Sequence, residues 1–219
     1  MKNSFPLLLL FLSIFFLKNL NGQDTIYLNN PSFEDIPRAG TPISPPIKGW
    51  FDCGKANFPN ESPPDIMPTV KPTWGVNMKA VNGESYLGLV VRDNHTWESL
   101  SQALSTPIME GKCYSFSAFI TKSQVYKSRT KRSDTLENFV RPALLVIWGG
   151  SSFCDKAELL SASPPVSNTD WKKFNFLFEP KKTYTFITIE AFYNLPAEPY
   201  NGHILVDGLS PIIETNCFK

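Results

Sequence analysis

The sequence predicts an all-β protein, an antiparallel β-sandwich of about nine strands. Three observations predict it. Segments rich in β-branched and aromatic residues recur along almost the whole chain, several of them alternate with a period of two, and Pro, Gly, Asn and Ser separate them. In residues 184–192, for example, Tyr184, Phe186 and Thr188 share one face and Ile187 and Ile189 the other.

The strands are expected, in chain order, at 26–34, 47–52, 86–91, near 97–104, and at 113–121, 143–150, 174–180, 183–193 and 203–213. The one helical candidate is DKAELL (155–160). Two long segments, the Pro-rich 53–80 and the segment 121–141, show no strand pattern and are expected to be loops.

The first 22 residues have the three-part layout of a secretory signal peptide, with Lys2 before an apolar run and Asn21-Gly22 after it. Residues 23–219 are then expected to form one domain, because no repeat and no linker divides them. Without Lys2 and Lys18, the 21 basic residues fall to 19 against 20 acidic ones, which argues against a nucleic-acid or membrane-surface role. No second apolar run is long enough to span a membrane. We therefore expect the protein to be secreted, periplasmic or on the cell surface.

Four cysteines in an exported chain predict two disulfides, with three pairings open. Cys113 opens one expected strand and Cys217 follows the last, so the two approach each other if those strands pair. That leaves Cys53 with Cys154, both in loops.

The order of motifs resembles the galactose-binding-like jelly-roll superfamily, in particular the secreted carbohydrate-binding-module-like domains of Bacteroidetes type. The motifs are NPSFE (30–34), GW (49–50), NGESYLGL (82–89), SLSQAL (99–104), EGKCYSFSAFI (110–120), W-x-x-F-x-F-x-F (171–178) and ILVDGLSPI (204–212). The resemblance covers nearly all of residues 23–219 and implies a two-sheet antiparallel jelly-roll β-sandwich. It also implies sugar binding on the concave face or at the loop ends, and often a structural calcium ion.

In the superfamily, the carboxylate of the first motif and the aspartate of the last strand meet at one calcium, which corresponds here to Glu34 and Asp207. Both border turns, where backbone carbonyls are free to ligate the ion. The alternative is that Glu34 is a solvated charge and Asp207 caps a bulge at Gly208. Phe33 is expected to point into the sandwich.

Sugars stack their C–H faces on aromatic rings, so aromatic residues in polar loops are candidates for glycan binding. Trp74 and Trp97 lie outside strand patterns, whereas Trp50, Trp148 and Trp171 are expected to pack in the core. The full set of expected ligand-binding residues is Trp74, Trp97, Arg92, Asn94, Tyr126, Glu190, Tyr193 and Asn194.

The loop 122–132 carries five basic residues around Tyr126. It could bind an acidic or sulfated glycan, or it could be a solvated loop tip balanced by Asp134 and Glu137.

Catalytic signals are weak. Glu98 and Glu190 are among several carboxylates that ordinary surface charge explains, and neither histidine has a nucleophile motif nearby. The sequence therefore predicts a secreted, non-catalytic protein that binds a polysaccharide or cell-surface glycan, not an enzyme. The alternative is a structural or adhesive protein that binds an envelope protein partner through the same β-sandwich.

Overall fold

The structure, a computed structural model, describes residues 25–57, 61–69, 71, 73–130, 132–194 and 198–217. The predicted signal peptide, residues 1–22, lies outside the described residues. The boundary of the expected domain at residue 23 lies outside them too and stays a prediction.

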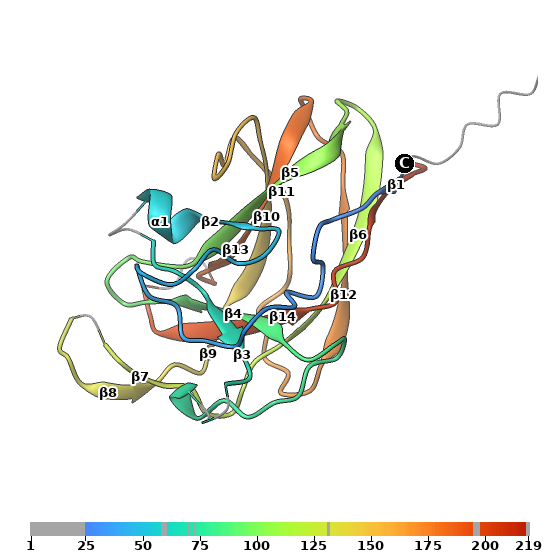
Figure 1. The fold of residues 1–219 in the computed structure, drawn as a ribbon. Helices are drawn as coiled ribbons and strands as arrows, with labels where there is room; N and C mark the ends of the chain where they lie inside the picture. Colours follow the sequence, from blue (N-terminus) through green and yellow to red (C-terminus); the bar gives the residue numbers. More distant parts are fainter. Residues whose placement is uncertain are drawn as a thin grey trace, which may run out of the picture.

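Two antiparallel sheets face each other around a shared core (Figure 1). The first sheet runs β1-β15-β6-β14-β4-β3, with β12 on the other side of β6 and β9 beside β14. Its strands are β1 (Thr25–Ile26), β3 (Asp65–Met67), β4 (Tyr86–Val91), β6 (Cys113–Thr121), β9 (Arg141–Pro142), β12 (Lys172–Phe178), β14 (Gly202–Asp207) and β15 (Ile212–Thr215).

The second sheet runs β11-β10-β13-β5-β2. Its strands are β2 (Phe51–Asp52), β5 (Ser99–Ile108), β10 (Leu144–Gly150), β11 (Glu158–Ala162) and β13 (Tyr184–Phe192). A separate hairpin of β7 (Lys127–Arg129) and β8 (Leu136–Asn138) projects at the lower left of Figure 1. The short helix α1 (Cys53–Asn57) and the 3₁₀ turn η1 (Thr73–Gly75) complete the elements.

The core between the sheets follows from the period-two patterns. Leu87 and Leu89 of β4 and Ile187 and Ile189 of β13 are fully buried in it. Every residue of β4 is buried, because its outward side chains Tyr86 and Val90 belong to a second apolar cluster on the outer face of the first sheet. That cluster also contains residues of both long loops.

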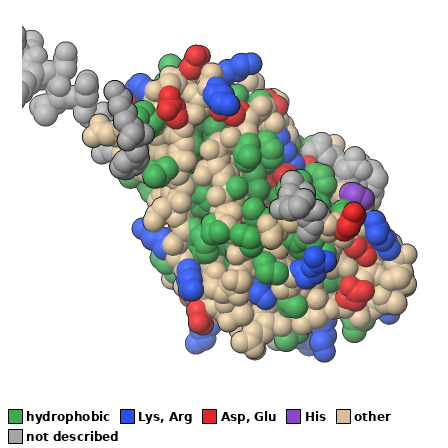
Figure 2. Space-filling view, turned by 180° about the vertical axis from the view of Figure 1, so that it is seen from behind, with side chains coloured by type: hydrophobic (Ala, Val, Ile, Leu, Met, Phe, Trp, Pro, Cys, Tyr) green, Lys and Arg blue, Asp and Glu red, His purple; other side chains and the backbone are tan. Residues whose placement is uncertain are grey.

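On the face shown in Figure 2, hydrophobic side chains gather in the middle and charges of both signs are interspersed around them.

The long strand predictions are confirmed. The expected strands at 86–91 and 113–121 match β4 and β6 end to end, and 143–150, 174–180 and 183–193 differ from β10, β12 and β13 by at most two residues at either end. The expected last strand is two strands, β14 and β15, which pair with opposite ends of β6. Gly208, at a φ of 53°, begins the break between them.

Five expectations were wrong. The segments 53–80 and 121–141 are not loops throughout, because the first contains α1, β3 and η1 and the second contains the hairpin of β7 and β8. DKAELL (155–160) is not helical; β11 begins within it at Glu158 and pairs with β10. The expected strands at 26–34 and 47–52 are only two residues long each, at Thr25–Ile26 and Phe51–Asp52. In the first of them, Asn30 and Phe33 take positive φ values of 47° and 55°, which an extended strand cannot contain.

Both disulfides join the predicted pairs, Cys53 with Cys154 and Cys113 with Cys217. β15 pairs with β6 at Thr215 and Cys113, which brings Cys217 to the start of β6 as expected. The first disulfide joins α1 to the loop between β10 and β11.

Phe33 points into the sandwich as predicted. It is fully buried, its ring centroid lies 5.4 Å from that of Trp50, and the Trp50 Nε1–H donates to the Asn30 carbonyl. This cluster fixes the N-terminal turn to the core.

Replacing Phe33 with alanine is expected to lower the free energy of unfolding by about 3–5 kcal/mol, because it leaves a cavity beside Trp50. Denaturant titration measures it. Ile43→Ala is the control, because Ile43 is 93% exposed and its replacement should change stability by less than about 0.5 kcal/mol. Equal effects of the two changes would contradict the described turn.

Candidate ligand-binding site

A cavity of about 340 Å³ lies over the outer face of the first sheet, beside the second apolar cluster. Segments far apart in sequence form it: 40–42 and 62–65, the turn η1, the ends of β4 and β5, and the loop that leads into the β7–β8 hairpin. Its lining includes the side chains of Ser62, Asp65, Trp74, Arg92, Glu98 and Tyr126.

Asp65, on the edge strand β3, joins three of these segments. Its Oδ1 accepts a hydrogen bond from the Gly40 backbone N–H (2.7 Å), and its Oδ2 accepts from Trp74 Nε1 (2.9 Å) and from the Tyr126 hydroxyl (2.6 Å). Burial raises the pKa of Asp65, and the hydrogen bonds from Tyr126, Gly40 and Trp74 oppose that rise. Only a glycine fits at position 40, because a Cβ there would lie 2.0 Å from the Pro63 carbonyl oxygen.

Trp74 and Tyr126 form an aromatic pair, with ring centroids 6.0 Å apart and ring planes 21° apart. Trp74 is half-buried and has a φ of 57°, a left-handed conformation that the turn η1 imposes. Tyr126 is buried and also stacks on His203. The rings therefore have a fixed position beside the Asp65 carboxylate.

Arg92 and Glu98 form a buried ion pair at 2.6 Å. Ser62 Oγ donates to Glu98 Oε1, and the Val90 backbone N–H donates to Glu98 Oε2. Burial raises the pKa of Glu98 to about 8; Arg92 opposes the rise and the negative charge of Asp65 adds to it.

Three of the eight expected ligand-binding residues therefore meet in this cavity: Trp74, Arg92 and Tyr126. Trp97 and Glu190 lie elsewhere, on the outer face of the second sheet, where Glu190 Oε2 accepts from Trp97 Nε1 at 3.0 Å. Glu190 also pairs with Lys156, and burial raises its pKa. Trp148 also donates to Glu190, so it is bonded on this outer face and not in the core that was expected for it.

The remaining three residues contact other parts of the chain. The buried Tyr193 donates its hydroxyl hydrogen to the Arg92 carbonyl, which supports the cavity from behind. Asn94 accepts from Thr96 within its own turn, and Asn194 is exposed.

Sequence reasoning missed Asp65 and Glu98. Asp65 does have a local signal in the sequence: its carboxylate stands between Pro64 and the apolar Ile66-Met67, where a charged group needs a partner. Glu98 and Glu190 were explained as surface charge, which is wrong because they are only 2% and 1% exposed.

Glu34 and Asp207, the expected calcium ligands, both bind the backbone of the turn formed by residues 81–85. Asp207 Oδ2 accepts from the Val81 and Asn82 backbone N–H groups, and Glu34 accepts from those of Glu84 and Ser85. N–H groups do not ligate a cation, so calcium would have to displace them. Calcium binding stays a prediction, which thermal unfolding with and without calcium checks.

Burial raises the pKa of Asp207 to about 6, and the backbone N–H groups oppose that rise. Gly83, at a φ of 72°, makes the close approach of the turn to Glu34 feasible, since a Cβ there would lie 2.1 Å from Glu34 Oε1.

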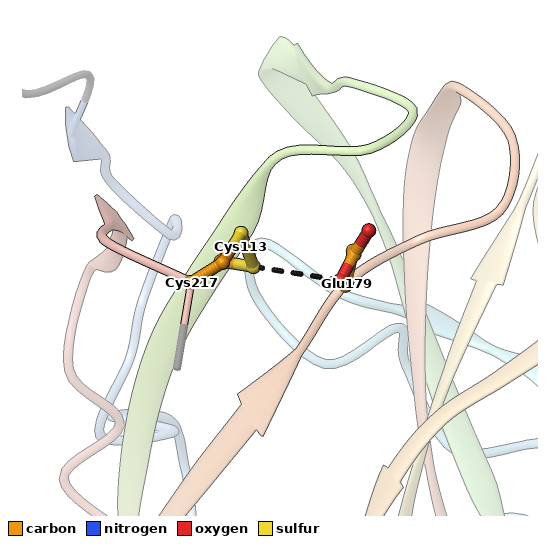
Figure 3. A group of neighbouring side chains, drawn as sticks. All are labelled: Cys113, Glu179 and Cys217. Carbon is orange, nitrogen blue, oxygen red and sulfur yellow. Dashed lines mark hydrogen bonds between the residues drawn. A yellow bond between two sulfur atoms is a disulfide. The ribbon is translucent and has the colours of Figure 1, made fainter. Parts of the chain in front are cut away.

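Figure 3 shows another group of candidate metal ligands, Cys113, Glu179 and Cys217. The two cysteines form a disulfide, so neither offers the thiolate that metals bind. For the same reason the 3.8 Å approach of Cys113 Sγ to Glu179 Oε2 is a contact without a donated hydrogen. This group is not a metal site while the disulfide is intact.

A second, more open hollow of about 400 Å³ lies beside β2, where Phe51 and Phe153 stack at 4.7 Å and are 40% and 47% exposed. Two amide side chains line it, Asn29 and Gln102, and that of Gln102 already bonds the backbones of Asn29 and Gly49. We favour the first cavity as the candidate site because buried charged groups line it.

No family model matches the sequence, and no curated protein sequence matches it. Solved structures do share the fold. A cyclase from Fischerella sp. TAU is 13% identical with a TM-score of 0.54, over 90% of this chain and 100% of that one. A Stig cyclase from Fischerella sp. TAU in complex with (3Z)-3-(1-methyl-2-pyrrolidinylidene)-3H-indole is 15% identical with a TM-score of 0.51, over 90% and 100%.

The N-terminal tandem of CBM22 carbohydrate-binding modules of a Paenibacillus barcinonensis protein is 11% identical with a TM-score of 0.50, over 90% of this chain and 48% of that one. The chain thus has the fold of these structures, an all-β jelly-roll sandwich that occurs both in carbohydrate-binding modules and in cyclases.

The prediction that the protein is not an enzyme was wrong, because solved structures that share its fold include enzymes. That prediction rested on the absence of recognisable catalytic motifs from the sequence. They do not exclude catalysis in a fold whose sites are assembled from distant loops.

The pH dependence of stability tests the environment of Glu98. Its pKa is about 8 in the folded state, against an ordinary 4.5, so the folded protein retains a proton that the unfolded chain has lost. The contribution is fully present below about pH 4.5 and is lost as the pH rises to about 8, with a total on the order of a few kcal/mol. Glu98→Gln should flatten this slope, measured by denaturant titration across the pH range.

The matched control is Glu110→Gln, which changes an exposed carboxylate and should leave the slope as in the wild type. A wild-type slope in Glu98→Gln would contradict the described burial of Glu98.

Proposed function

We propose that the protein binds a carbohydrate in the cavity lined by Asp65, Trp74, Arg92, Glu98 and Tyr126. One observation carries the proposal: a fixed aromatic pair lies beside buried carboxylates and a guanidinium group in one cavity. The fold, which carbohydrate-binding modules share, supports it.

The aromatic pair suits the apolar C–H face of a sugar ring. Trp74 is half-buried, so part of its ring is accessible, and its Nε1–H is held by Asp65. A ring held in this way loses little conformational entropy when a sugar stacks on it.

The polar groups suit sugar hydroxyls. Arg92 offers N–H donors, and Ser62 both accepts from Arg92 and donates to Glu98. A hydroxyl group that enters this network finds donors and acceptors already oriented.

We further propose that the protein acts outside the cytoplasm. Its two disulfides are typical of an oxidising compartment. Among the helices of the described residues, none combines the length and the hydropathy that a membrane crossing requires. An envelope protein partner stays a prediction.

Trp74→Ala should weaken binding of the best oligosaccharide from a glycan array by about five- to tenfold, because a stacked aromatic ring contributes about 1–1.5 kcal/mol. Isothermal titration calorimetry measures it. Trp171→Ala is the matched control: Trp171 packs edge-on against Tyr86, outside the cavity lining, and its loss should leave affinity unchanged. Wild-type affinity in a folded Trp74→Ala protein would refute the site.

A second candidate function is hydrolysis of the bound glycan in the same cavity. Its motivating observation is a pair of buried carboxyl groups in one cavity, with the pKa of Glu98 raised to about 8. Glu98 would donate a proton to the glycosidic oxygen as the C–O bond breaks, and Asp65 would accept a proton from the water that adds to the sugar. We rank it second because Arg92 and Ser62 already occupy Glu98 Oε1.

Incubation of the protein with the oligosaccharide, followed by mass spectrometry, tests the second candidate. Hydrolysis predicts shorter products from the wild type and none from Glu98→Gln. Unchanged oligosaccharide with the wild type would exclude this candidate and leave binding as the function.

A further inference from the structure

We infer that the ligand carries a positively charged amino group, as an amino sugar does, and that Asp65 receives it. The inference rests on the proposed function and names the class of carbohydrate.

The first step is the charge balance of the cavity. Three charged side chains line it: Asp65, Arg92 and Glu98. Arg92 is bonded directly to Glu98, at 2.6 Å. Asp65 has no ion-pair partner among the described residues, because its three hydrogen bonds come from a backbone amide, an indole and a phenol, all neutral. Among the described residues, no cation contacts Asp65 directly: the charge of Arg92 acts on it from a distance, while the guanidinium group itself bonds Glu98 and Ser62.

The second step is the burial of that charge. Asp65 is only 4% exposed, and a buried carboxylate is costly unless a cation pairs with it. Burial raises its pKa, and the hydrogen bonds from Tyr126, Gly40 and Trp74 and the charge of Arg92 oppose the rise without cancelling it. A cationic ligand would supply the missing compensation.

The third step is the number of hydrogen-bond acceptor positions that remain unused on the Asp65 carboxylate. Two oxygens offer about four acceptor positions, and Asp65 uses three of them. Its Oδ1 accepts only from Gly40, so one position on that oxygen is free for a further N–H donor. An ammonium group could fill it with a charge-assisted hydrogen bond.

The fourth step is the aromatic pair. Trp74 and Tyr126 both bond Asp65 Oδ2, so their rings lie next to the carboxylate. Aromatic faces attract ammonium groups through the cation–π interaction. The rings and the carboxylate thus favour the same kind of group.

The basic residues of the neighbouring hairpin do not cancel this preference. In strand β7, Ser128 lines the cavity, so Lys127 and Arg129 point to the opposite side. Arg129 is 67% exposed and pairs with Asp134. The expected binding of acidic glycans to the loop 122–132 concerns that other surface and stays a prediction.

The test compares two oligosaccharides that differ by one group per sugar. Chitosan hexaose and cellohexaose share the β-1,4 linkage, but the first has an amino group where the second has a hydroxyl. Calorimetry at low salt should show at least about tenfold tighter binding of chitosan hexaose to the wild type, a preference that decreases as salt is added. Asp65→Asn should abolish the preference, and the readout is the ratio of the two affinities, because the substitution also affects the bonds that hold Trp74 and Tyr126.

Asp134→Asn is the control, because it removes a carboxylate that is 83% exposed and lies outside the cavity lining, and it should keep the preference. If the wild type binds cellohexaose as tightly as chitosan hexaose, the inference is overturned and carbohydrate binding stands. If a glycan array of neutral, acidic and amino sugars gives no binding, the proposed function itself fails. The wild-type comparison decides the question even if Asp65→Asn does not fold.

Discussion

The candidate site depends on one buried carboxylate. Asp65 accepts hydrogen bonds from three segments that are far apart in the sequence: the Gly40 backbone, the Trp74 indole and the Tyr126 hydroxyl. Removing a buried hydrogen-bond acceptor leaves its donors unsatisfied, which costs about 1–3 kcal/mol for each. The positions of both aromatic rings therefore follow from the position of Asp65 on β3.

The outer face of the first sheet is the surface on which the segments 53–80 and 121–141 pack. The apolar Tyr86 and Val90 on its outer face hold the loops by burial, and His203 of β14 holds the second loop by hydrogen bonds. His203 Nε2 accepts from the Ser123 backbone N–H, and its other ring nitrogen bonds the Phe139 carbonyl. Burial lowers the pKa of His203 to about 4, so the ring stays neutral and keeps both bonds near neutral pH.

The sequence predicted the fold well wherever the period-two pattern was long. β4 and β6 could be read to the residue, because burial between two layers dictates their composition. Short strands such as β1 and β2 could not, because pairing over two residues leaves no pattern. DKAELL looked helical locally, but pairing of β11 with β10 overrode that preference.

The site could be predicted only in part. Trp74, Arg92 and Tyr126 were found because each type of side chain can bind sugar and each stands in or beside a loop. Asp65 and Glu98 were not, because their role arises from partners up to 61 positions away in sequence, as in the bond between Tyr126 and Asp65. No local pattern encodes such a contact. The same reason explains why Trp97 and Glu190 were placed with the site although they pair on the other sheet.

The indole N–H resonances of the protein test the central claim most directly. Each of the five tryptophans donates its indole hydrogen to an identified acceptor: Trp50 to Asn30, Trp74 to Asp65, Trp97 and Trp148 to the two oxygens of Glu190, and Trp171 to Lys79. In an NMR titration of ¹⁵N-labelled protein with chitosan hexaose, the account predicts that the Trp74 indole resonance shifts most and that of Trp50 stays in place. Saturable shifts confined to Trp97 and Trp148, with Trp74 unmoved, would contradict it.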